Sequence, residues 1–351
     1  MAQKTGARQQ NLDELRALAM MMVVVLHFLG KGNLLGDVTA DTMDSVGVFA
    51  WVLEAFCIVA VNCYMLLSGY FLCESEFKLS RLFKHYLQVW MYSVGIGLVA
   101  AATGFVPAAE VDTHYYLTLL FPVSMGHYWF MTAYLFLYVM LPVVLTGVRH
   151  MDQKQMQGSI LLLLAVFCLC KSVLPFRLEQ DGLSYDVVWY LCVFLLAAYI
   201  RKFGMPVLAK RWRCMCFYLG GCGLILAEFF VLRELYLRRG SFGLILKVSF
   251  EYNHMFALLA AVGLFGFFLQ SKGSGIAGKA ARVISPYVLG VYLLHENIGV
   301  RYGWQRLFHV GEIRTVPELI LWTVLAAVCM FAAGVALEWL RSILVKALGE
   351  K

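Results

Sequence analysis

Charge is scarce in this chain. Asp, Glu, Lys and Arg make up 15% of the 351 residues, whereas 61% are hydrophobic and the mean hydropathy is +0.74. A soluble domain of this length needs far more polar surface to cover its core. No nucleic-acid-binding motif accompanies the net charge of +7, so we predict no nucleic-acid partner. The composition therefore excludes a soluble globular protein and predicts a helical protein of the lipid bilayer.

Several common functional motifs are also missing. The ten cysteines lie mostly within apolar segments, and no Cys-x-x-Cys pattern with nearby histidines occurs. We therefore expect neither a disulfide framework nor a metal site. No nucleophile elbow, Walker A motif or dinucleotide-binding glycine pattern stands in a suitable context, so the chemistry of those motifs is not expected either.

Apolar runs recur along the whole sequence. They predict an all-α polytopic integral membrane protein with about ten transmembrane helices. The loops are too short for a soluble domain, so residues 1–351 are expected to form a single transmembrane domain with no appended soluble domain. The fifth, sixth and ninth runs look short and could be tilted, broken or shielded by neighbours. The predicted spans are 12–34, 46–72, 84–105, 122–145, 159–175, 187–200, 214–232, 250–269, 286–299 and 317–340.

Lys and Arg are divided unevenly between alternate loops. If the N-terminus is cytoplasmic, eighteen of them lie in cytoplasmic segments and ten in outer loops, with Arg16 set aside in the first span. Positive charge favours the cytoplasmic side of a membrane protein. We therefore predict a multi-pass protein of the cell (inner) membrane with both termini in the cytoplasm.

Two ionisable residues, Arg16 and His27, lie in the first apolar run. They are eleven positions apart, which on a helix is about three turns plus roughly 20°, so both face one stripe about 16 Å long. The predicted orientation places Arg16 at the cytoplasmic interface and His27 deep in the membrane, where an ionisable group is costly and marks a functional site. Arg16 suits a phosphate group and His27 suits general-base work. A topology anchor and an interhelical hydrogen bond are the structural alternatives.

Further candidates lie in the later apolar runs. His295 and Glu296 are adjacent in the ninth span, and because neighbouring helical residues diverge by about 100°, we expect that they cannot both face one point. His127 and Trp129 begin the fourth span, where Trp129 could equally be an interfacial aromatic anchor.

A cationic run follows the end of the second span. Ser68 and Tyr70 flank a glycine that permits close backbone approach, and Lys78, Arg81 and Lys84 come soon after. This run would attract either anionic lipid headgroups or a polyanionic cofactor.

Intramembrane acids keep a second function open. Glu54, Glu228 and Glu296, with the intramembrane histidines, could serve a proton-coupled transporter or a flippase of a glycan or lipid precursor, and Glu338 is a further intramembrane acid. Each acid could instead pair with a neighbouring donor. The absence of repeat symmetry and of paired broken helices speaks against transport.

Four segments, taken in order, resemble the membrane acyltransferase 3 family. They are residues 13–19 with His27, which form an Arg-x10-His signature; 67–71; 127–130 followed by Tyr134; and 285–287 with 290–295. Together they extend over about 280 residues, so the resemblance covers most of the chain. It implies about ten transmembrane helices and transfer of an acyl group, usually acetyl, from acetyl-CoA.

The acceptors in this family are hydroxyls of extracytoplasmic sugars: O-antigen, exopolysaccharide, peptidoglycan or a lipid-linked precursor. The resemblance therefore implies acyl-CoA and a saccharide or lipid-linked glycan as partners in the bilayer, with no metal. His27 would be a base or an acylated relay. The implied residues are His27, Arg16 and His295 for catalysis; Arg16, Arg81, Lys84, Ser68 and Tyr70 for acyl-CoA; and His127, Trp129 and Glu296 for the substrate.

Overall fold

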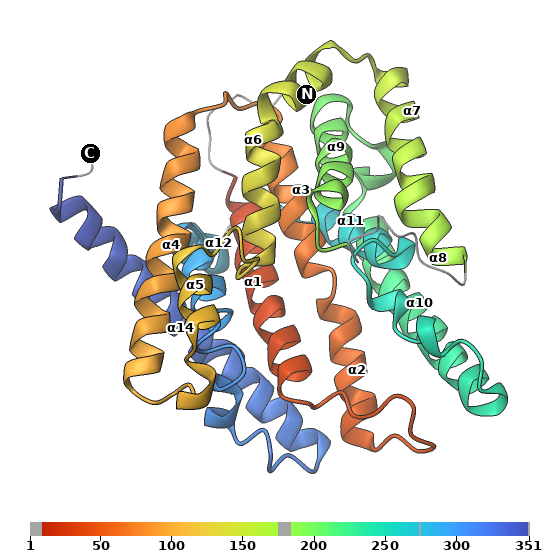
Figure 1. Ribbon diagram of the computed structural model, residues 1–351. Coiled ribbons are helices and arrows are strands. Elements are labelled where there is room, and N and C mark those ends of the chain that lie inside the picture. Colours follow the sequence, from red (N-terminus) through yellow and green to blue (C-terminus); the bar gives the residue numbers. More distant parts are fainter. Residues whose placement is uncertain (1–8, 175–183, 274, 350–351) are drawn as a thin grey trace.

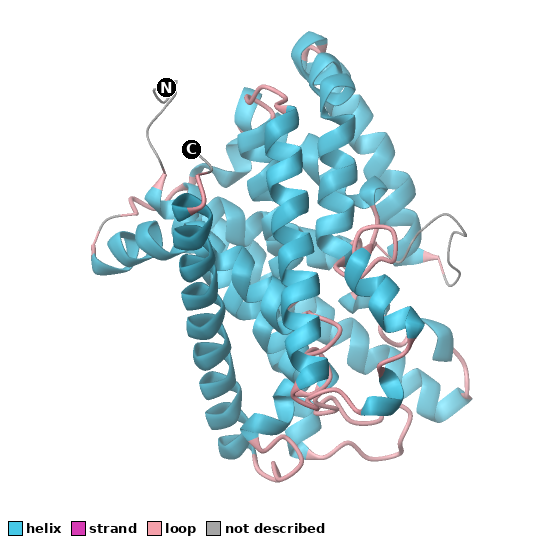
Figure 2. Ribbon diagram, turned by 60° about the vertical axis from the view of Figure 1, so that its left-hand side comes forward, coloured by secondary structure: helices cyan, strands magenta, loops and turns pink. Residues whose placement is uncertain are grey.

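Helices are the regular elements throughout the described part of the chain, as the computed structural model shows (Figures 1 and 2). The structure describes residues 9–174, 184–273 and 275–349. The all-α prediction is confirmed within these ranges. The start of α1 and the end of α14 lie at the same end of the bundle in both views. Four charges used for the orientation, Lys4, Arg8, Arg177 and Lys351, lie outside the described residues.

Helix α1 (Gln10–Lys31) lies at the centre of the bundle (Figure 1). It contacts α2, α3, α11, α12, α13 and α14, so side chains from distant parts of the chain meet on it. The surrounding helices are α2 (Ser45–Cys57), α3 (Ala60–Leu72), α4 (Leu79–Ala102), α5 (Thr113–Leu120), α6 (Trp129–His150), α7 (Gln153–Leu164), α8 (Lys171–Val173), α9 (Val187–Phe203), α10 (Arg211–Arg239), α11 (Met255–Leu269), α12 (Ile276–Ile284), α13 (Val288–His295) and α14 (Val316–Ala347).

Short irregular turns link several of these helices. A π-helical turn, η2 (Ala165–Cys170), joins α7 to α8. The others are the 3-10 turns η1 (Ala108–Glu110), η3 (Pro206–Ala209), η4 (Gly243–Ile245), η5 (Val248–Phe250), η6 (Ser285–Tyr287) and η7 (Trp304–Phe308).

Six helical stretches among the described residues are long and apolar enough to cross a membrane. Multi-pass character is therefore supported, but the predicted count of about ten is not confirmed. Helix α1 carries Asp13, Glu14, Arg16 and Lys31, and α9 has only 17 residues. The six stretches are Ser45–Leu72, Trp129–His150, Gln153–Val173, Arg211–Arg239, Gly243–Leu269 and Val316–Ala347.

The predicted ninth span, 286–299, is not one continuous helix. The turn η6 leads into α13, which has eight residues and ends at His295. Beyond it, the Asn297 amide donates to two carbonyls of α4, Tyr92 O at 3.1 Å and Ser93 O at 3.2 Å. These bonds hold the chain in a turn, so the helical run stops inside the bundle. The predicted fifth span, 159–175, ends at a residue outside the described ranges.

Glycines allow α13 to pack closely against α14. A Cβ on Gly290 would come within 2.5 Å of the Glu338 Cβ, and a Cβ on Gly334 would come within 2.7 Å of the Val291 nitrogen. Neither position has room for a side chain. This close packing fixes the height of α13, and therefore of His295, beside the central helix.

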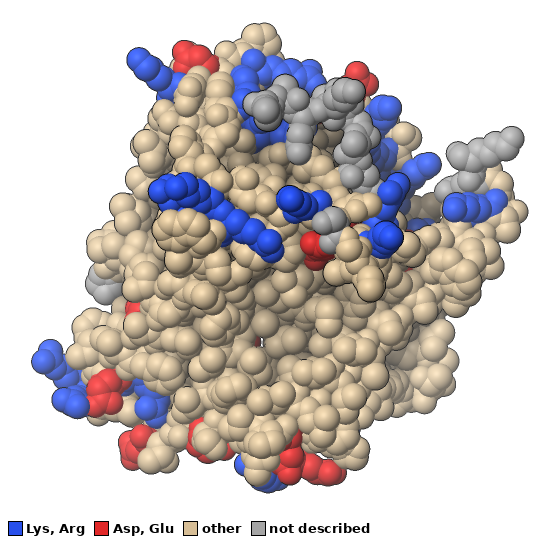
Figure 3. All heavy atoms as spheres, turned by 180° about the vertical axis from the view of Figure 1, so that it is seen from behind, with Lys and Arg blue, Asp and Glu red and all other residues tan. Residues whose placement is uncertain are grey.

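Charged side chains avoid the middle of the face seen in Figure 3. Lys and Arg predominate over the upper end, which holds the start of α1, with a few acidic groups among them, whereas the two signs are more evenly mixed at the opposite end. An apolar belt between two charged ends is typical of a membrane-spanning domain. The basic end is the one that the sequence predicts to be cytoplasmic.

Candidate active site

Arg16 and His27 line the same cavity, as their spacing on one helical stripe predicts. The cavity has a volume of about 230 Å³ and lies among α1, α3, α4, α6, η6 and α13. Its other lining residues include Ser68, His85, Trp129, Phe130, Tyr134, Tyr252, Ser285 and Tyr292. The helical stripe therefore faces an enclosed space, and the two ionisable side chains sit at different depths along it.

The guanidinium of Arg16 is held by two partners. Its Nη1 donates to Asp13 Oδ1 at 2.7 Å and to Ser285 Oγ at 3.4 Å, and Ser285 Oγ donates to Asp13 Oδ1 at 2.6 Å. Its side chain keeps 29% of its surface exposed. The Arg-x10-His segment and the Ser-Pro-Tyr segment, far apart in the sequence, therefore meet at this point. Arg16 is oriented for a ligand while donors of its fork remain available.

A second pocket opens on the other side of Arg16. It has a volume of about 340 Å³, and it shares Arg16, Ser285 and Pro286 with the first cavity. Its remaining lining residues are Gln9, Asp13 and Phe71. Because both spaces share these three residues, Arg16 stands at a junction between the basic end of the bundle and the cavity that leads to His27.

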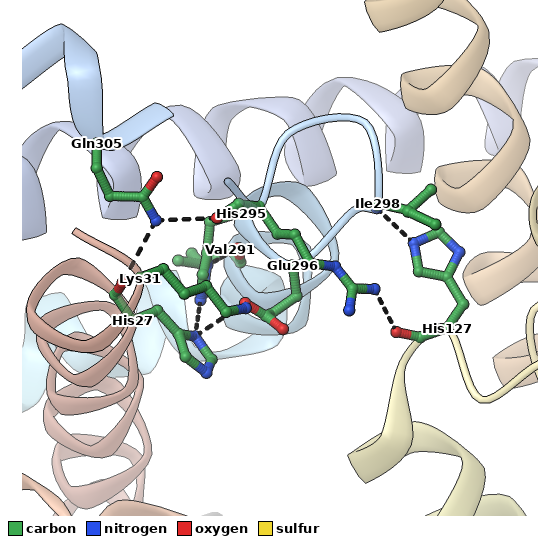
Figure 4. Close-up of polar contacts among 9 residues, drawn as sticks. His27, Lys31, His127, Val291, His295, Glu296, Ile298 and Gln305 are labelled. Atoms are coloured by element: carbon green, nitrogen blue, oxygen red, sulfur yellow. Dashed lines mark hydrogen bonds and ion pairs between the residues drawn. The ribbon is translucent and has the colours of Figure 1, made fainter. Parts of the chain in front are cut away.

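His27 lies between His295 and Glu296 (Figure 4). Its Nδ1 is 2.8 Å from His295 Nε2 and 3.3 Å from Glu296 Oε1. The expectation that His295 and Glu296 cannot face one point is therefore wrong. Helix α13 ends at His295, so Glu296 leaves the helical path and its carboxylate turns back to the same place.

The hydrogen bonds assign the histidine tautomers. His295 Nδ1 is 2.6 Å from the Val291 carbonyl oxygen, which can only accept, so this nitrogen carries a proton. In a neutral His295, Nε2 is then an acceptor, and His27 Nδ1 donates to it. The remaining ring nitrogen of His27, Nε2, is left with a lone pair. A neutral imidazole with a free lone pair beside a cavity can accept a proton from a substrate.

Lys31 completes this group, and the sequence analysis missed it as a site residue. Its ammonium forms an ion pair with Glu296 Oε1. Lys31 follows His27 by four positions on α1, a spacing that places both on one face and could have identified it. The pairing gives the buried carboxylate a countercharge within an apolar bundle.

The same group offers three potential metal ligands. Atoms of His27, His295 and Glu296 all lie within 4.8 Å of one another. However, the direct bond between the two imidazoles and the ion pair with Lys31 already engage these atoms. The geometry favours a hydrogen-bond network here, and the absence of a metal stays a prediction.

His127 is buried elsewhere, with both ring nitrogens engaged by the protein (Figure 4). Its Nε2 accepts from the Ile298 backbone N–H at 2.7 Å, so Nδ1 carries the proton and donates to Ser93 Oγ at 2.9 Å. It does not line the cavity. These bonds hold the turn after α13, whereas the predicted role in substrate binding stays a prediction.

Two of the predicted contact residues, Trp129 and Ser68, line the cavity. Trp129 stacks on Tyr252 with ring centroids 5.7 Å apart, and Ser68 Oγ accepts from Tyr190 at 2.9 Å. Tyr70 is not among the lining residues. Its hydroxyl accepts from Arg201 at 3.0 Å on another face of α3.

The two predicted cations on α4 differ in position. Arg81 precedes His85 by four residues, and His85 lines the cavity, so Arg81 shares its helical face. Lys84 is exposed and lies off that face. Neither cation lines the two pockets around Arg16, so their role in binding acyl-CoA stays a prediction.

Comparison with known proteins decides the family. A family model described as an acyltransferase domain matches residues 9–340, nearly the whole chain. The protein belongs to the acyltransferase 3 family. No curated protein and no solved structure matches the chain. For a membrane acyltransferase, the cavity shared by Arg16 and His27 is the natural candidate for the active site.

Proposed function

We propose that the protein moves a short acyl group, such as acetyl, from acyl-CoA to a hydroxyl of an extracytoplasmic saccharide or lipid-linked glycan. The observation that carries this proposal is that Arg16 and His27 line one cavity. An acyl-CoA molecule needs cationic partners for its phosphates and a base near its thioester. Arg16 and His27 would supply these two groups, about 16 Å apart along α1. The resemblance of the four motifs supports the donor and the acceptor class.

The position of Arg16 supports entry of the donor from the basic end of the bundle. Phosphate groups would meet Arg16 at the junction of the two pockets. The narrow pantetheine arm would then extend along α1 towards His27. A cavity of about 230 Å³ lined by Trp129, Phe130 and Tyr292 favours a small acyl group over a long chain.

In the proposed reaction, His27 acts as the general base. The acceptor hydroxyl attacks the thioester carbonyl carbon, and its proton moves to His27 Nε2. The new C–O bond forms, the C–S bond breaks, and His27 returns the proton to the departing CoA thiolate. His295 and Glu296 hold His27 by Nδ1, which keeps Nε2 directed to the reaction.

Three of the four intramembrane acids have partners within the bundle, whereas the buried Glu54 Oε2 has no hydrogen-bond partner among the described residues. Glu296 is paired with Lys31, and Glu338 is bound by Arg341 through two hydrogen bonds of 2.7 and 2.9 Å. His254 Nε2 lies 3.2 Å from Glu228 Oε2. Local partners account for these three acids, so a proton relay is not needed to explain them.

The decisive experiment uses membranes that contain the full-length protein and acetyl-CoA labelled in its acetyl group. We expect label to enter a glycan or lipid fraction with wild type and to fall at least 100-fold with His27→Ala, in line with the loss of a general base. Equal amounts of inserted protein are the control. Transfer that persists in His27→Ala would overturn the role of His27. Label retained on wild-type protein in the absence of acceptor would make His27 a covalent relay instead of a base.

A further inference from the structure

Tyr292 lines the cavity of Arg16 and His27 with an unused hydroxyl. Tyr292 is only 5% exposed, and its hydroxyl has no acceptor among the described residues, although the backbone N–H of Phe130 is directed at its oxygen. Leaving a buried hydroxyl unpaired costs about 1–3 kcal/mol. A polar group kept at that cost inside a cavity is suited to meet a polar atom of a ligand.

The surrounding rings fix the orientation of Tyr292. It precedes His295 by three positions on α13, so the two share a helical face. Its ring is nearly perpendicular to that of His295, with centroids 6.2 Å apart, and it also packs against Phe130 and Tyr128 at 6.2 and 5.9 Å. The hydroxyl is therefore carried by the same short helix that positions the imidazole behind His27.

Three tyrosines near the cavity already donate their hydroxyl protons to protein acceptors. Tyr64 donates to the Arg16 carbonyl oxygen at 2.6 Å, and Tyr128 donates to the Leu293 carbonyl oxygen at 2.9 Å. Tyr190 donates to Ser68 Oγ. Tyr292 thus differs from these three neighbours in having a donor without an acceptor.

We propose that the Tyr292 hydroxyl donates a hydrogen bond to the carbonyl oxygen of the acyl thioester. This inference rests on the proposed acyl transfer. As the acceptor oxygen attacks the carbonyl carbon, negative charge builds on the carbonyl oxygen, and a fixed donor in the cavity stabilises it. Tyr292 keeps its proton throughout, while the proton of the acceptor moves to His27 and then to the CoA sulfur. The site would then have two separate groups: His27 moves the proton, and Tyr292 stabilises the charge on the carbonyl oxygen.

Tyr292→Phe in the full-length protein tests this role, because it removes only the hydroxyl. In membranes supplied with labelled acetyl-CoA, we expect kcat for acyl transfer to fall about 10²-fold or more. Binding of acetyl-CoA, measured separately with the label at equilibrium, should stay within about twofold. A smaller effect on binding than on kcat identifies an interaction that strengthens in the transition state.

Tyr92→Phe is the matched control. Tyr92 is also buried, but its hydroxyl interacts with the Glu338 carboxylate and it lies outside this cavity. We expect wild-type transfer from this variant. Wild-type kcat in Tyr292→Phe, or an equal loss in both variants, would overturn the role of Tyr292 alone. Wild-type membranes that transfer no label would overturn the proposed function itself, and this role with it.

Discussion

His27 and His127 both lie in apolar parts of the bundle, yet His127 is buried whereas the His27 side chain is 18% exposed. His127 donates through one ring nitrogen and accepts through the other, and both partners belong to the protein. His27 gives Nδ1 to His295 and Glu296, and Nε2 remains for a substrate beside the cavity. The comparison teaches that burial alone does not identify a catalytic histidine. A free lone pair that faces a cavity is the deciding property.

After loss of His27 itself, the largest effect on kcat is expected from loss of His295, which contacts His27 Nδ1. His295→Leu removes the acceptor for His27 Nδ1, so the imidazole loses its fixed tautomer and kcat should fall about 10- to 100-fold. His295→Gln keeps an acceptor oxygen on a side chain of similar length and should recover part of this loss. Transfer of labelled acetyl groups at saturating acetyl-CoA measures both variants. Equal losses in the two would contradict a positioning role for His295.

A smaller effect is expected at the other end of the stripe. Arg16→Lys keeps the charge but loses the fork that reaches Asp13 and Ser285, so KM for acetyl-CoA should rise about 10-fold while kcat changes little. Initial rates over a range of acetyl-CoA concentrations give both constants.

The control for this prediction is Arg238→Lys, the same replacement at an exposed ion pair with Glu234 on α10. Its KM should equal that of wild type. A fall in kcat at unchanged KM in Arg16→Lys would mean that Arg16 acts on the reaction and not on donor binding.

The smallest effect on catalysis is expected at His127. His127→Ala leaves the Ile298 N–H and Ser93 without their buried partner, so stability should fall by about 1–3 kcal/mol. Transfer per folded molecule should stay within about twofold. Thermal unfolding in detergent and labelled transfer at low temperature separate the two properties. A large loss of kcat without a change in stability would show that His127 contacts the substrate, as the sequence predicts, and would remove the contrast with His27.

Periodicity could predict the helical stripe of Arg16 and His27, because the spacing of residues on one helix follows from its geometry. The contact of Asp13 with Arg16 is also local, three positions along α1. Periodicity could not predict that Ser285 would join them, since Ser285 lies 269 positions from Arg16 and 272 from Asp13. The ninth span failed for a related reason. Hydropathy predicts a continuous apolar span. In the structure, α13 ends where Asn297 bonds to α4 and Glu296 pairs with Lys31 of α1.

Lys31 and Tyr292 show what a closer look at the sequence could and could not have found. Lys31 follows His27 by one helical turn, so it was accessible to the same spacing argument. The free donor of Tyr292 was not, because three other tyrosines around it differ in having acceptors nearby.

The amino-acid sequence by itself determined that the chain is helical, membrane-embedded and an acyltransferase 3 protein, since low charge, helical periodicity and ordered motifs are properties of the linear chain. Only the tertiary structure decided which ionisable residues share a cavity and which ring nitrogen remains free. Those properties depend on contacts between α1 and α13, which lie more than 250 residues apart, and on where α13 ends. Hydrogen-bond partners at such separation are set by packing, and local propensity carries no record of them.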